Sequence, residues 1–285
     1  MARITSGVGT THVPAIGAAQ DHDKTQDEYW RPLFEGYGPA RAWARDHTPD
    51  VAIVIFNDHA NAMGLDFIPT FALGVGDVYQ PADEGYGRRK VPPMQGHPEL
   101  AWHLVENLIL DEFDMTIIND LDVDHGCTVP LSVLYDQPDQ WPCRIIPLWV
   151  NVLQYPSPSG KRCFALGQAL RRAVESFPED LNVAVFGTGG MSHQLQGERA
   201  GLVNEPFDRA FLDDLTADPA RLTRITHLEY IREAGAEGSE LVMWLVMRGA
   251  LANPKEVYRF YHMPASNTGA GLIILDDATP TEAPT

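Results

Sequence analysis

Short runs of apolar and β-branched residues recur along the chain and alternate with longer segments of helical periodicity. Runs of this length are typical of buried strands, because both faces of a central strand contact apolar neighbours. The pattern predicts strands at Arg3–Val8, Val51–Phe56, Met115–Ile118, Ile145–Val152 and Asn182–Phe186.

The segments between these strands predict helices. One begins near His97, with Pro98 in its first turn, where a missing N–H costs no hydrogen bond. Another follows the turn PSPSG and runs through Leu166–Ser176, and a third covers Ser239–Leu251 with Ser239 as its N-cap. Alternating strands and helices indicate an α/β fold with a central mixed β-sheet flanked by helices and an active site at the carboxyl ends of the strands.

No internal repeat and no Pro/Ser-rich linker divides the 285 residues, a length that suits one large α/β domain. We expect a single catalytic domain at residues 1–275 and a disordered acidic tail at residues 276–285. The segment Tyr79–Pro93 is rich in Pro, Gly and charge, and it predicts a long surface loop of the kind that is often functional.

The charge and hydropathy of the chain restrict its partners. A formal net charge of -18 repels phosphate backbones, so the sequence argues against a nucleic acid partner. The same charge repels small anions, whose binding needs local donors or a partner chain that carries positive charge. No apolar run approaches the ~20 residues of a membrane span, and the first residues lack a signal-peptide core, so we expect a cytoplasmic protein that does not enter membranes.

The three cysteines form no CxxC pair, which argues against zinc-ribbon and thioredoxin-like sites. They are Cys127, Cys143 and Cys163. Cys127 follows His125 by two residues, so a Cys–His nucleophile is an alternative. It is disfavoured because the base of such a site usually comes from a distant segment.

Four of the ten histidines follow closely after predicted strands: His12, His59, His125 and His193. In open α/β sheets ligands bind outside the carboxyl ends of the strands, where these side chains can converge. A single loop histidine is often an ordinary hydrogen-bonded residue, so the argument rests on their joint placement. Imidazole is a common ligand of zinc, iron and copper, and two histidines with one carboxylate form the facial site of non-haem Fe(II) oxygenases.

The pattern leaves the carboxylate open. Glu240 opens a strongly apolar helix, although an acidic residue in a first turn also stabilises the helix dipole. Asp58 adjoins His59, although adjacent strand residues point to opposite faces of a sheet.

The motif GTGG at Gly187–Gly190 follows a predicted strand. It matches neither GxGxxG nor a Walker motif, so nucleotide binding is disfavoured. We interpret the small residues as allowing close backbone approach, which brings His193 into a pocket.

Long segments along nearly the whole chain carry a family resemblance. Among them are THVPAIGAA, NDHA, PADEGYG, DVDHGCTVPLS, GTGGMSHQLQGERAGL, GSELVMWLVMRGAL and FYHMPASNT. The chain resembles the catalytic β subunits of protocatechuate 4,5-dioxygenases, in the class III extradiol ring-cleavage family. The resemblance implies one non-haem Fe(II) per chain and O2-dependent cleavage of protocatechuate at the 4,5 bond to 4-carboxy-2-hydroxymuconate semialdehyde. Gallate or another catechol acid is the alternative substrate, and a zinc hydrolase or a non-enzymatic metal-pocket scaffold is the alternative function.

Carried over onto matching positions, the resemblance implies metal ligation by His12, His59 and Glu240, and so selects Glu240 over Asp58. It implies that His193 moves protons during catalysis.

Further active-site roles come from the same resemblance. It implies that His125 is a catalytic residue, that Ser266 and Asn267 bind the substrate carboxylate, and that Asn57 lies near the metal pocket. It also implies a partner, a small helical α subunit in an α2β2 assembly.

Overall fold

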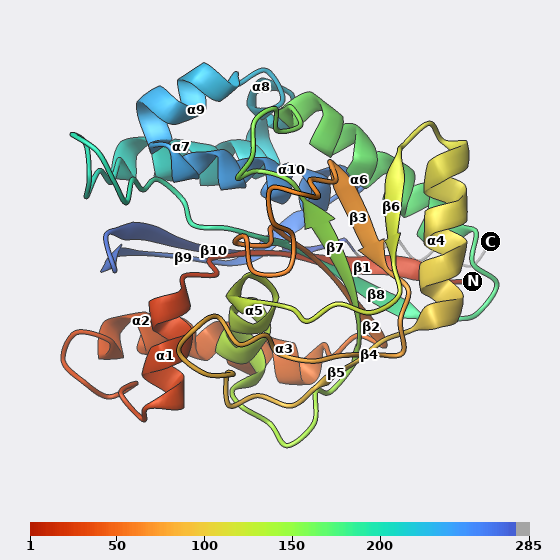
Figure 1. Cartoon of the computed structure of the whole chain (residues 1–285), viewed down its shortest axis with the longest axis horizontal. Coiled ribbons are helices and arrows are strands. Elements are labelled where there is room, and N and C mark those ends of the chain that lie inside the picture. Colours follow the sequence, from red (N-terminus) through yellow and green to blue (C-terminus); the bar gives the residue numbers. More distant parts are fainter. Residues whose placement is uncertain (278–285) are drawn as a thin grey trace, which may run out of the picture.

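An eight-stranded sheet with the strand order β6-β3-β7-β2-β8-β1-β10-β9 forms the centre of the computed structural model, which describes residues 1–277, with the backbone alone at residues 264 and 265 (Figure 1). Its strands are β1 (Arg3–Thr10), β2 (Val51–Phe56), β3 (Phe71–Gly74), β6 (Met115–Ile118), β7 (Arg144–Val150), β8 (Asn182–Thr188), β9 (Lys255–Ala265) and β10 (Thr268–Asp276). A separate small ribbon pairs β4 (Val78–Tyr79) with β5 (Met94–Gln95).

Helices cover both faces of the sheet, as Figure 1 shows. One layer consists of α1 (Pro14–Asp21), α2 (Arg31–Gly36), α3 (Gly38–Asp46) and α5 (His125–Tyr135). The other consists of α4 (Pro98–Leu110), α6 (Gly160–Glu175), α7 (Glu205–Ala217), α8 (Pro219–Leu222), α9 (His227–Ala234), the 3-10 turn η1 (Glu237–Glu240) and α10 (Leu241–Gly249). None of the helices within residues 1–277 is long and apolar enough to cross a bilayer.

The sheet is mixed, as predicted. Strands β7, β2, β8 and β1 are parallel neighbours, whereas β10 pairs antiparallel with β1 and with β9. Strand β3 is antiparallel to β7 and parallel to β6. Because both faces of the sheet are covered, the central strand β2 is a continuous apolar run without alternation, and every one of its residues is buried.

All five predicted strands are present, with ends displaced by no more than two residues. Three strands of the sheet were not predicted: β3, β9 and β10. The strand β3 is a four-residue run, FALG, that ends in glycine and contains no β-branched residue, and β9 carries mixed polar and apolar residues as the edge strand of the sheet.

The predicted helices are present, but one N-terminus is placed differently. The helix α4 starts at Pro98, and the His97 side chain caps it by accepting a hydrogen bond from the Leu100 N–H. The prediction that Ser239 caps the third helix is wrong. Ser239 lies inside η1, where its hydroxyl faces the Ala236 carbonyl, and α10 starts at Leu241.

The C-terminal boundary of the domain lies beyond residue 275, where the sequence predicted it. Asp276 ends β10, and the buried carboxylate of Asp277 accepts hydrogen bonds from the Arg171 guanidinium and from two backbone N–H groups, at Ala252 and Asn253. The ordered domain therefore includes residue 277, and the remainder of the predicted tail, 278–285, lies outside the described residues.

Candidate metal centre

Three of the four predicted histidines lie just beyond the carboxyl ends of adjacent parallel strands. His12 follows β1, His59 follows β2, and His193 follows β8. They meet at a cavity of about 250 Å³. Its walls are formed by His12, Val13, Pro14, Ala15, His59, His125, Gly190, His193, Leu195, Glu240, Ser266 and Thr268.

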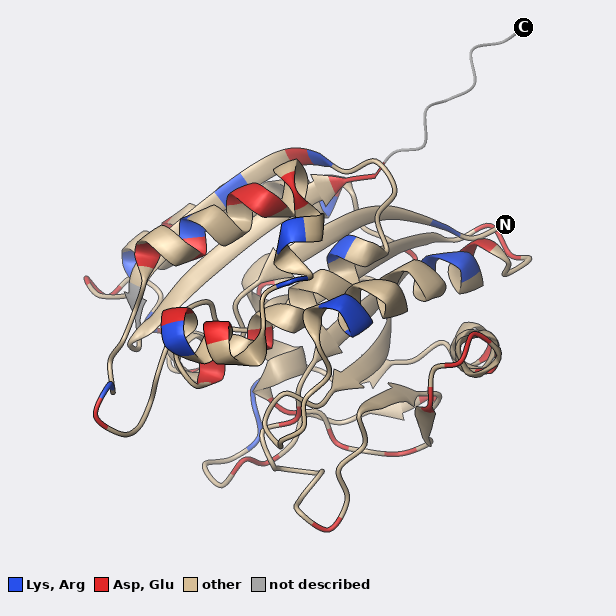
Figure 2. Ribbon diagram, turned by 90° about the horizontal axis from the view of Figure 1, so that it is seen from above, with Lys and Arg blue, Asp and Glu red and all other residues tan. Residues whose placement is uncertain are grey.

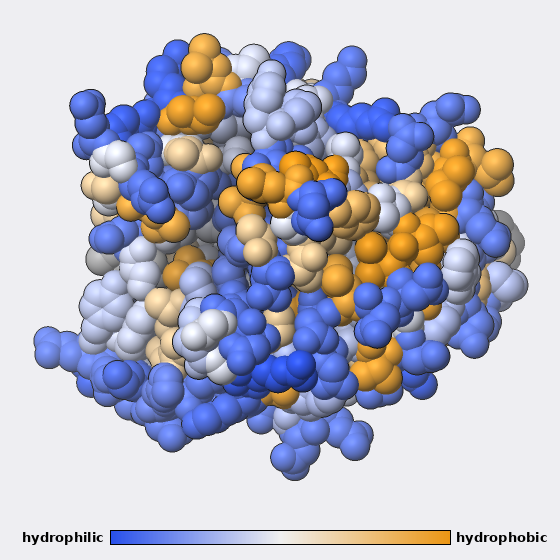
Figure 3. Space-filling view, viewed as in Figure 1, coloured by the Kyte–Doolittle hydropathy of each residue, from blue (hydrophilic) through white to orange (hydrophobic). Residues whose placement is uncertain are grey.

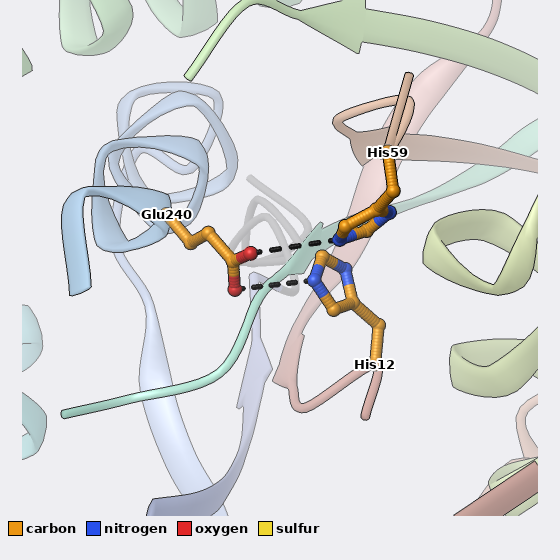
Figure 4. A group of neighbouring side chains, drawn as sticks. All are labelled: His12, His59 and Glu240. Atoms are coloured by element: carbon orange, nitrogen blue, oxygen red, sulfur yellow. Dashed lines mark hydrogen bonds and ion pairs between the residues drawn. The ribbon is translucent and has the colours of Figure 1, made fainter. Parts of the chain in front are cut away.

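The carboxylate of Glu240 lies against two of these histidines in the wall of the cavity. The Nε2 atom of His12 lies 3.1 Å from Oε2 of Glu240, and Nε2 of His59 lies 3.6 Å from Oε1. Figure 4 shows one carboxylate oxygen facing each ring. Two atoms bonded at about 2.1 Å to one ion, at a right angle, lie about 3 Å apart. The three side chains therefore fit a single metal ion, and their nitrogen and oxygen donors match the set that non-haem iron uses.

Hydrogen bonds behind the rings place a proton on Nδ1 of each histidine, so a metal that binds here would meet Nε2 of both rings. The Thr188 hydroxyl lies 2.9 Å from the Ile55 carbonyl, which can only accept, so the hydroxyl proton points there. The same oxygen lies 3.0 Å from Nδ1 of His12 and must accept its proton. On the other ligand, Nδ1 of His59 donates to Asp124 over 2.8 Å. A hydrogen bond at the ring nitrogen that does not bind the metal fixes the tautomer of a metal-binding histidine.

The glycines of the GTGG motif let Glu240 come close. A Cβ atom at Gly189, where φ is +136°, would lie 2.8 Å from Cβ of Glu240. The next residue, Gly190, donates its N–H to Oε2 of Glu240 over 2.7 Å. The sequence interpretation concerned His193, and a Cβ atom at Gly190 would lie 2.7 Å from Cε1 of that ring, so the small residues also make room for His193 at the cavity.

The histidines and carboxylates of the centre shift one another's pKa values. Burial lowers the pKa of His12, while at His59 the carboxylates of Asp124 and Glu240 outweigh burial and raise the pKa to about 10. Burial alone would raise the pKa of both carboxyl groups, but the imidazoles hold that of Asp124 at about 2 and that of Glu240 well below its usual range. Both carboxylates are therefore ionised at neutral pH, and a divalent cation would neutralise them.

His193 is held apart from the three ligand side chains. Its Nε2 atom lies 4.0 Å from Oε2 of Glu240. Its Nδ1 atom lies 2.8 Å from the Met191 carbonyl, which accepts only, so Nδ1 carries a proton and Nε2 has a free lone pair. A histidine in this state can accept a proton from a group bound in the cavity.

His125 lines the same cavity but starts α5 instead of following a strand directly. Its ring lies against that of His59, with centroids 3.9 Å apart. The Glu84 carboxylate accepts hydrogen bonds from both its backbone N–H and its Nδ1.

The predicted substrate contacts differ in their positions. Ser266 lines the cavity, whereas Asn267 is exposed at the tip of the β9–β10 hairpin and does not line it. Asn57 is buried, and its amide nitrogen lies 3.2 Å from Nε2 of His59, which places it beside the ligand cluster. The prediction for Asn267 therefore lacks support from this geometry.

The two alternatives left by the sequence do not reach the cavity walls. The Asp58 carboxylate accepts backbone hydrogen bonds from residues 61–63 and shapes that loop. The thiol of Cys127 is buried against Met94, and burial raises its pKa well above the usual range. The geometry therefore favours Glu240 over Asp58 and argues against a Cys127 nucleophile.

Three residues that complete the centre were missed: Glu84, Asp124 and Thr188. Asp124 caps α5 by accepting a hydrogen bond from the Gly126 N–H. An aspartate directly before a helix is a recognisable N-cap signal, so this residue could have been found from the sequence. For Glu84 and Thr188 the sequence offers no such signal, since their partners are 41 and 176 residues away.

The family profile described as "Catalytic LigB subunit of aromatic ring-opening dioxygenase" matches residues 6–271. A gallate dioxygenase of Pseudomonas putida is 48% identical over 69% of this chain and 58% of its own length. A 2,3-dihydroxyphenylpropionate/2,3-dihydroxicinnamic acid 1,2-dioxygenase of Paraburkholderia xenovorans is 30% identical over 66% of this chain and 57% of its own length. The matches thus span somewhat more than half the length of these two curated relatives.

The fold is also found in an uncharacterized protein of Escherichia coli K12, JW3007. Its crystal structure matches 95% of this chain and 99% of its own with a TM-score of 0.60 and 13% sequence identity. At that identity the likeness concerns the fold alone, and it supports one α/β domain built on the large mixed sheet. The family match covers nearly all of the described chain, including the three candidate metal ligands His12, His59 and Glu240. The chain therefore belongs to the family of catalytic LigB subunits of aromatic ring-opening dioxygenases.

Proposed function

We propose that this chain is the catalytic subunit of a non-haem Fe(II) extradiol dioxygenase whose preferred substrate is gallate. The observation that carries the choice of gallate is the 48% identity to a gallate dioxygenase. The cluster of His12, His59 and Glu240 supports iron as the metal, because two histidines and one carboxylate leave coordination positions open. Protocatechuate, the substrate expected from the residue resemblance, is the second candidate.

Bound ferrous iron would supply Lewis acidity toward two adjacent ring hydroxyls and the electrons that make dioxygen reactive. The chain itself must hold the ring with those hydroxyls toward the His12 and His59 side of the cavity. Holding the reactants together removes much of the entropic cost of their encounter.

His193 is proposed to accept a hydroxyl proton at Nε2 and to return it later in the reaction. The Met191 carbonyl fixes its tautomer, so the lone pair is in place before the substrate arrives. The histidine stays outside hydrogen-bonding distance of Glu240 and can move a proton without competing for the metal. Cleavage would occur beside the two hydroxyl-bearing carbons, as in extradiol reactions.

The substrate carboxylate is proposed to bind near Ser266 and Thr268, two hydroxyl-bearing residues that line the cavity. The cavity wall contains no lysine and no arginine, so the carboxylate has no full counter-charge from the lining residues. Hydroxyl and backbone donors can bind an anion under these conditions.

A partner chain is a further part of the proposal, namely a small helical α subunit in an α2β2 assembly. Apolar side chains are exposed on the loops that follow β2 and β7, near the centre of the face in Figure 3. They include Leu65, Phe67, Ile68 and Leu153. Exposed apolar groups of this kind are typical of interaction surfaces. Co-expression with a candidate α chain, followed by light scattering, measures whether a stable hetero-oligomer forms.

We also propose that the protein works in the cytoplasm. The cysteines Cys127, Cys143 and Cys163 are buried and unpaired, as expected in a reducing compartment. Fractionation of cells that express the full-length protein tests this location.

The decisive experiment is anaerobic reconstitution with Fe(II) or Zn(II), followed by addition of air and of gallate, protocatechuate or unsubstituted catechol. We expect oxygen uptake and a ring-fission product with Fe(II) only, and the highest kcat/KM with gallate. A higher kcat/KM with protocatechuate would shift the assignment to the second candidate. Absence of oxygen uptake with every catechol, with and without an α chain, would contradict the dioxygenase function.

A further inference from the structure

Two imidazole rings at the cavity are clamped by carboxylates in the same way. Asp124 accepts from the backbone N–H of His59 and from its Nδ1, both over 2.8 Å. Glu84 accepts from the backbone N–H of His125 over 2.9 Å and from its Nδ1 at shorter range. The two rings lie against each other at a tilt of 30°. One clamp thus serves a proposed metal ligand, and the other serves a histidine outside the ligand set.

The clamp determines which nitrogen of His125 carries the proton. A carboxylate accepts hydrogen bonds and donates none, so Nδ1 must carry a proton. The opposite ring nitrogen, Nε2, makes no hydrogen bond within residues 1–277, and the ring is part of the cavity wall. In the neutral ring Nε2 therefore has a free lone pair on a side chain that lines the cavity.

The loop that carries Glu84, residues 80–93, is fastened to the domain on both sides of that residue. On one side, Ala82 N–H donates to the Val123 carbonyl over 2.8 Å. On the other, the buried guanidinium of Arg89 pairs with Asp21 of α1, with Nε 3.0 Å from Oδ2. The Glu84 side chain is itself only 11% exposed. This fastening holds the carboxylate against His125 without a contribution from the ligand side chains.

We propose that Glu84 is a positioning residue that keeps His125 in the Nδ1–H tautomer, so that Nε2 accepts a hydrogen bond from a hydroxyl of the bound phenol. The role in turnover rests on the function proposed above, whereas the tautomer belongs to the protein alone. The clamp of Asp124 acts on a metal ligand, and the clamp of Glu84 acts on the substrate side.

Glu84→Gln keeps the shape of the side chain but replaces one of the two accepting oxygens by an NH2 donor. The amide oxygen can still accept from the backbone N–H of His125, which turns the NH2 group toward Nδ1. That arrangement favours a proton on Nε2 and removes the acceptor from the cavity. Asp83→Asn is the matched control, since it removes the same charge from the same loop, and the Asp83 side chain contacts the N–H groups of Gly85 and Gly87 instead.

The tautomer is measured by two-dimensional 15N–1H NMR of ring nitrogens in ion-free protein at about pH 8, above the ordinary histidine range. We expect the Nδ1–H tautomer of His125 in the wild type and in D83N, and the Nε2–H tautomer in E84Q. An Nε2–H or doubly protonated ring in the wild type would overturn the proposal, as would an unchanged ring in E84Q. Glu84→Asp retains two acceptor oxygens, and we expect it to keep the wild-type tautomer even if E84Q folds poorly.

Kinetics with Fe(II)-loaded protein test the consequence. We expect E84Q to lower kcat/KM by about 10- to 100-fold, by analogy with the range for groups that support metal-binding histidines, and to leave Fe(II) affinity within about twofold. We expect D83N to retain wild-type kcat/KM. An unchanged kcat/KM in E84Q despite a reversed tautomer would overturn the positioning role. If no phenol is turned over by the wild type, the proposed function fails, while the NMR result still decides the tautomer.

Discussion

At the scale of single residues, one hydroxyl group connects three segments of the metal centre. The Thr188 side chain lies within hydrogen-bonding distance of the Ile55 carbonyl, the Gly126 carbonyl and Nδ1 of His12. A hydroxyl has one proton, and both carbonyls only accept, so the His12 nitrogen must be the donor in its own contact. Thr188 thereby sets the tautomer of a proposed ligand without approaching the metal.

Replacement of Thr188 by Val keeps the shape of the side chain and removes this acceptor. We expect Thr188→Val to weaken Fe(II) binding by about 10- to 100-fold, because outer partners orient the ligand and raise its basicity. Thr188→Ser, which keeps the hydroxyl, should bind Fe(II) nearly as the wild type does. Anaerobic competition with a chromogenic chelator measures both affinities, and equal affinities for the Val and Ser variants would contradict the assignment.

Substitution of two histidines separates metal binding from proton transfer. His193→Ala should retain Fe(II) and lose turnover by about 10²- to 10⁴-fold, because Nε2 is the proposed proton acceptor. His12→Ala should lose bound Fe(II) itself. Metal analysis of each purified variant, together with oxygen uptake, distinguishes the two outcomes. Wild-type turnover by the His193 variant would remove its assigned role.

The sequence predicted the histidines better than it predicted their supports. A histidine after a buried strand is visible as a pattern, because strand ends converge in an α/β sheet. Choosing Glu240 over Asp58 needed the family resemblance, since both are acidic residues beside apolar segments. Thr188 and Glu84 were missed because they acquire their roles only through tertiary contacts with distant residues.

At the scale of elements, helix α7 supports the segment that carries His193. Its buried residue Asp208 accepts hydrogen bonds from the Ser192 N–H over 2.8 Å and from the Ser192 hydroxyl over 2.7 Å. It also accepts from the Tyr261 hydroxyl of β9 over 2.8 Å. One carboxylate thus ties α7, the turn after β8 and the β9–β10 hairpin together.

This carboxylate makes stability depend on pH. Burial raises the pKa of Asp208 to about 6, although its hydrogen bonds act in the opposite direction. The unfolded value is about 3.9, so the folded protein holds the extra proton between the two values and loses stability as pH rises through about 6. Relative to Asp208→Asn, the wild type should lose roughly 3 kcal/mol of unfolding free energy between about pH 4 and pH 7. Urea unfolding across this range measures the difference, and parallel curves for the two proteins would contradict it.

The elements that the sequence predicted correctly are those whose burial shows in their composition. The run at Val51–Phe56 has no polar residue and became the fully buried β2. The helix near Ser239 was placed too early, because a serine before an apolar run is also compatible with a 3-10 turn that precedes the helix.

At the scale of the whole molecule, the negative charge opposes the proposed substrate. Acidic residues are spread over many helices and loops in Figure 2, and the net charge is -18. A gallate anion approaching the cavity is therefore repelled at long range, although local donors can hold it once it is bound.

Salt should relieve this repulsion. We expect kcat/KM for gallate to rise about two- to fivefold when salt increases from about 10 mM to about 200 mM, because the Debye length contracts from about 30 Å to less than 10 Å. An uncharged catechol should show no such rise and serves as the control. A fall in kcat/KM for gallate over the same range would indicate local positive steering instead.

The three proposed metal ligands lie far apart in the sequence, and this separation has a consequence for biosynthesis. His12 and His59 are made early, but their carboxylate partner Glu240 is made 181 residues after His59, and β1 needs β8 and β10 as its sheet neighbours. A growing polypeptide on the ribosome therefore holds two histidines without the acid that completes the set. A metal held by all three side chains can therefore bind only after Glu240 has been made, so the proposed ferrous ion would act on a nearly complete domain instead of guiding its folding from the start.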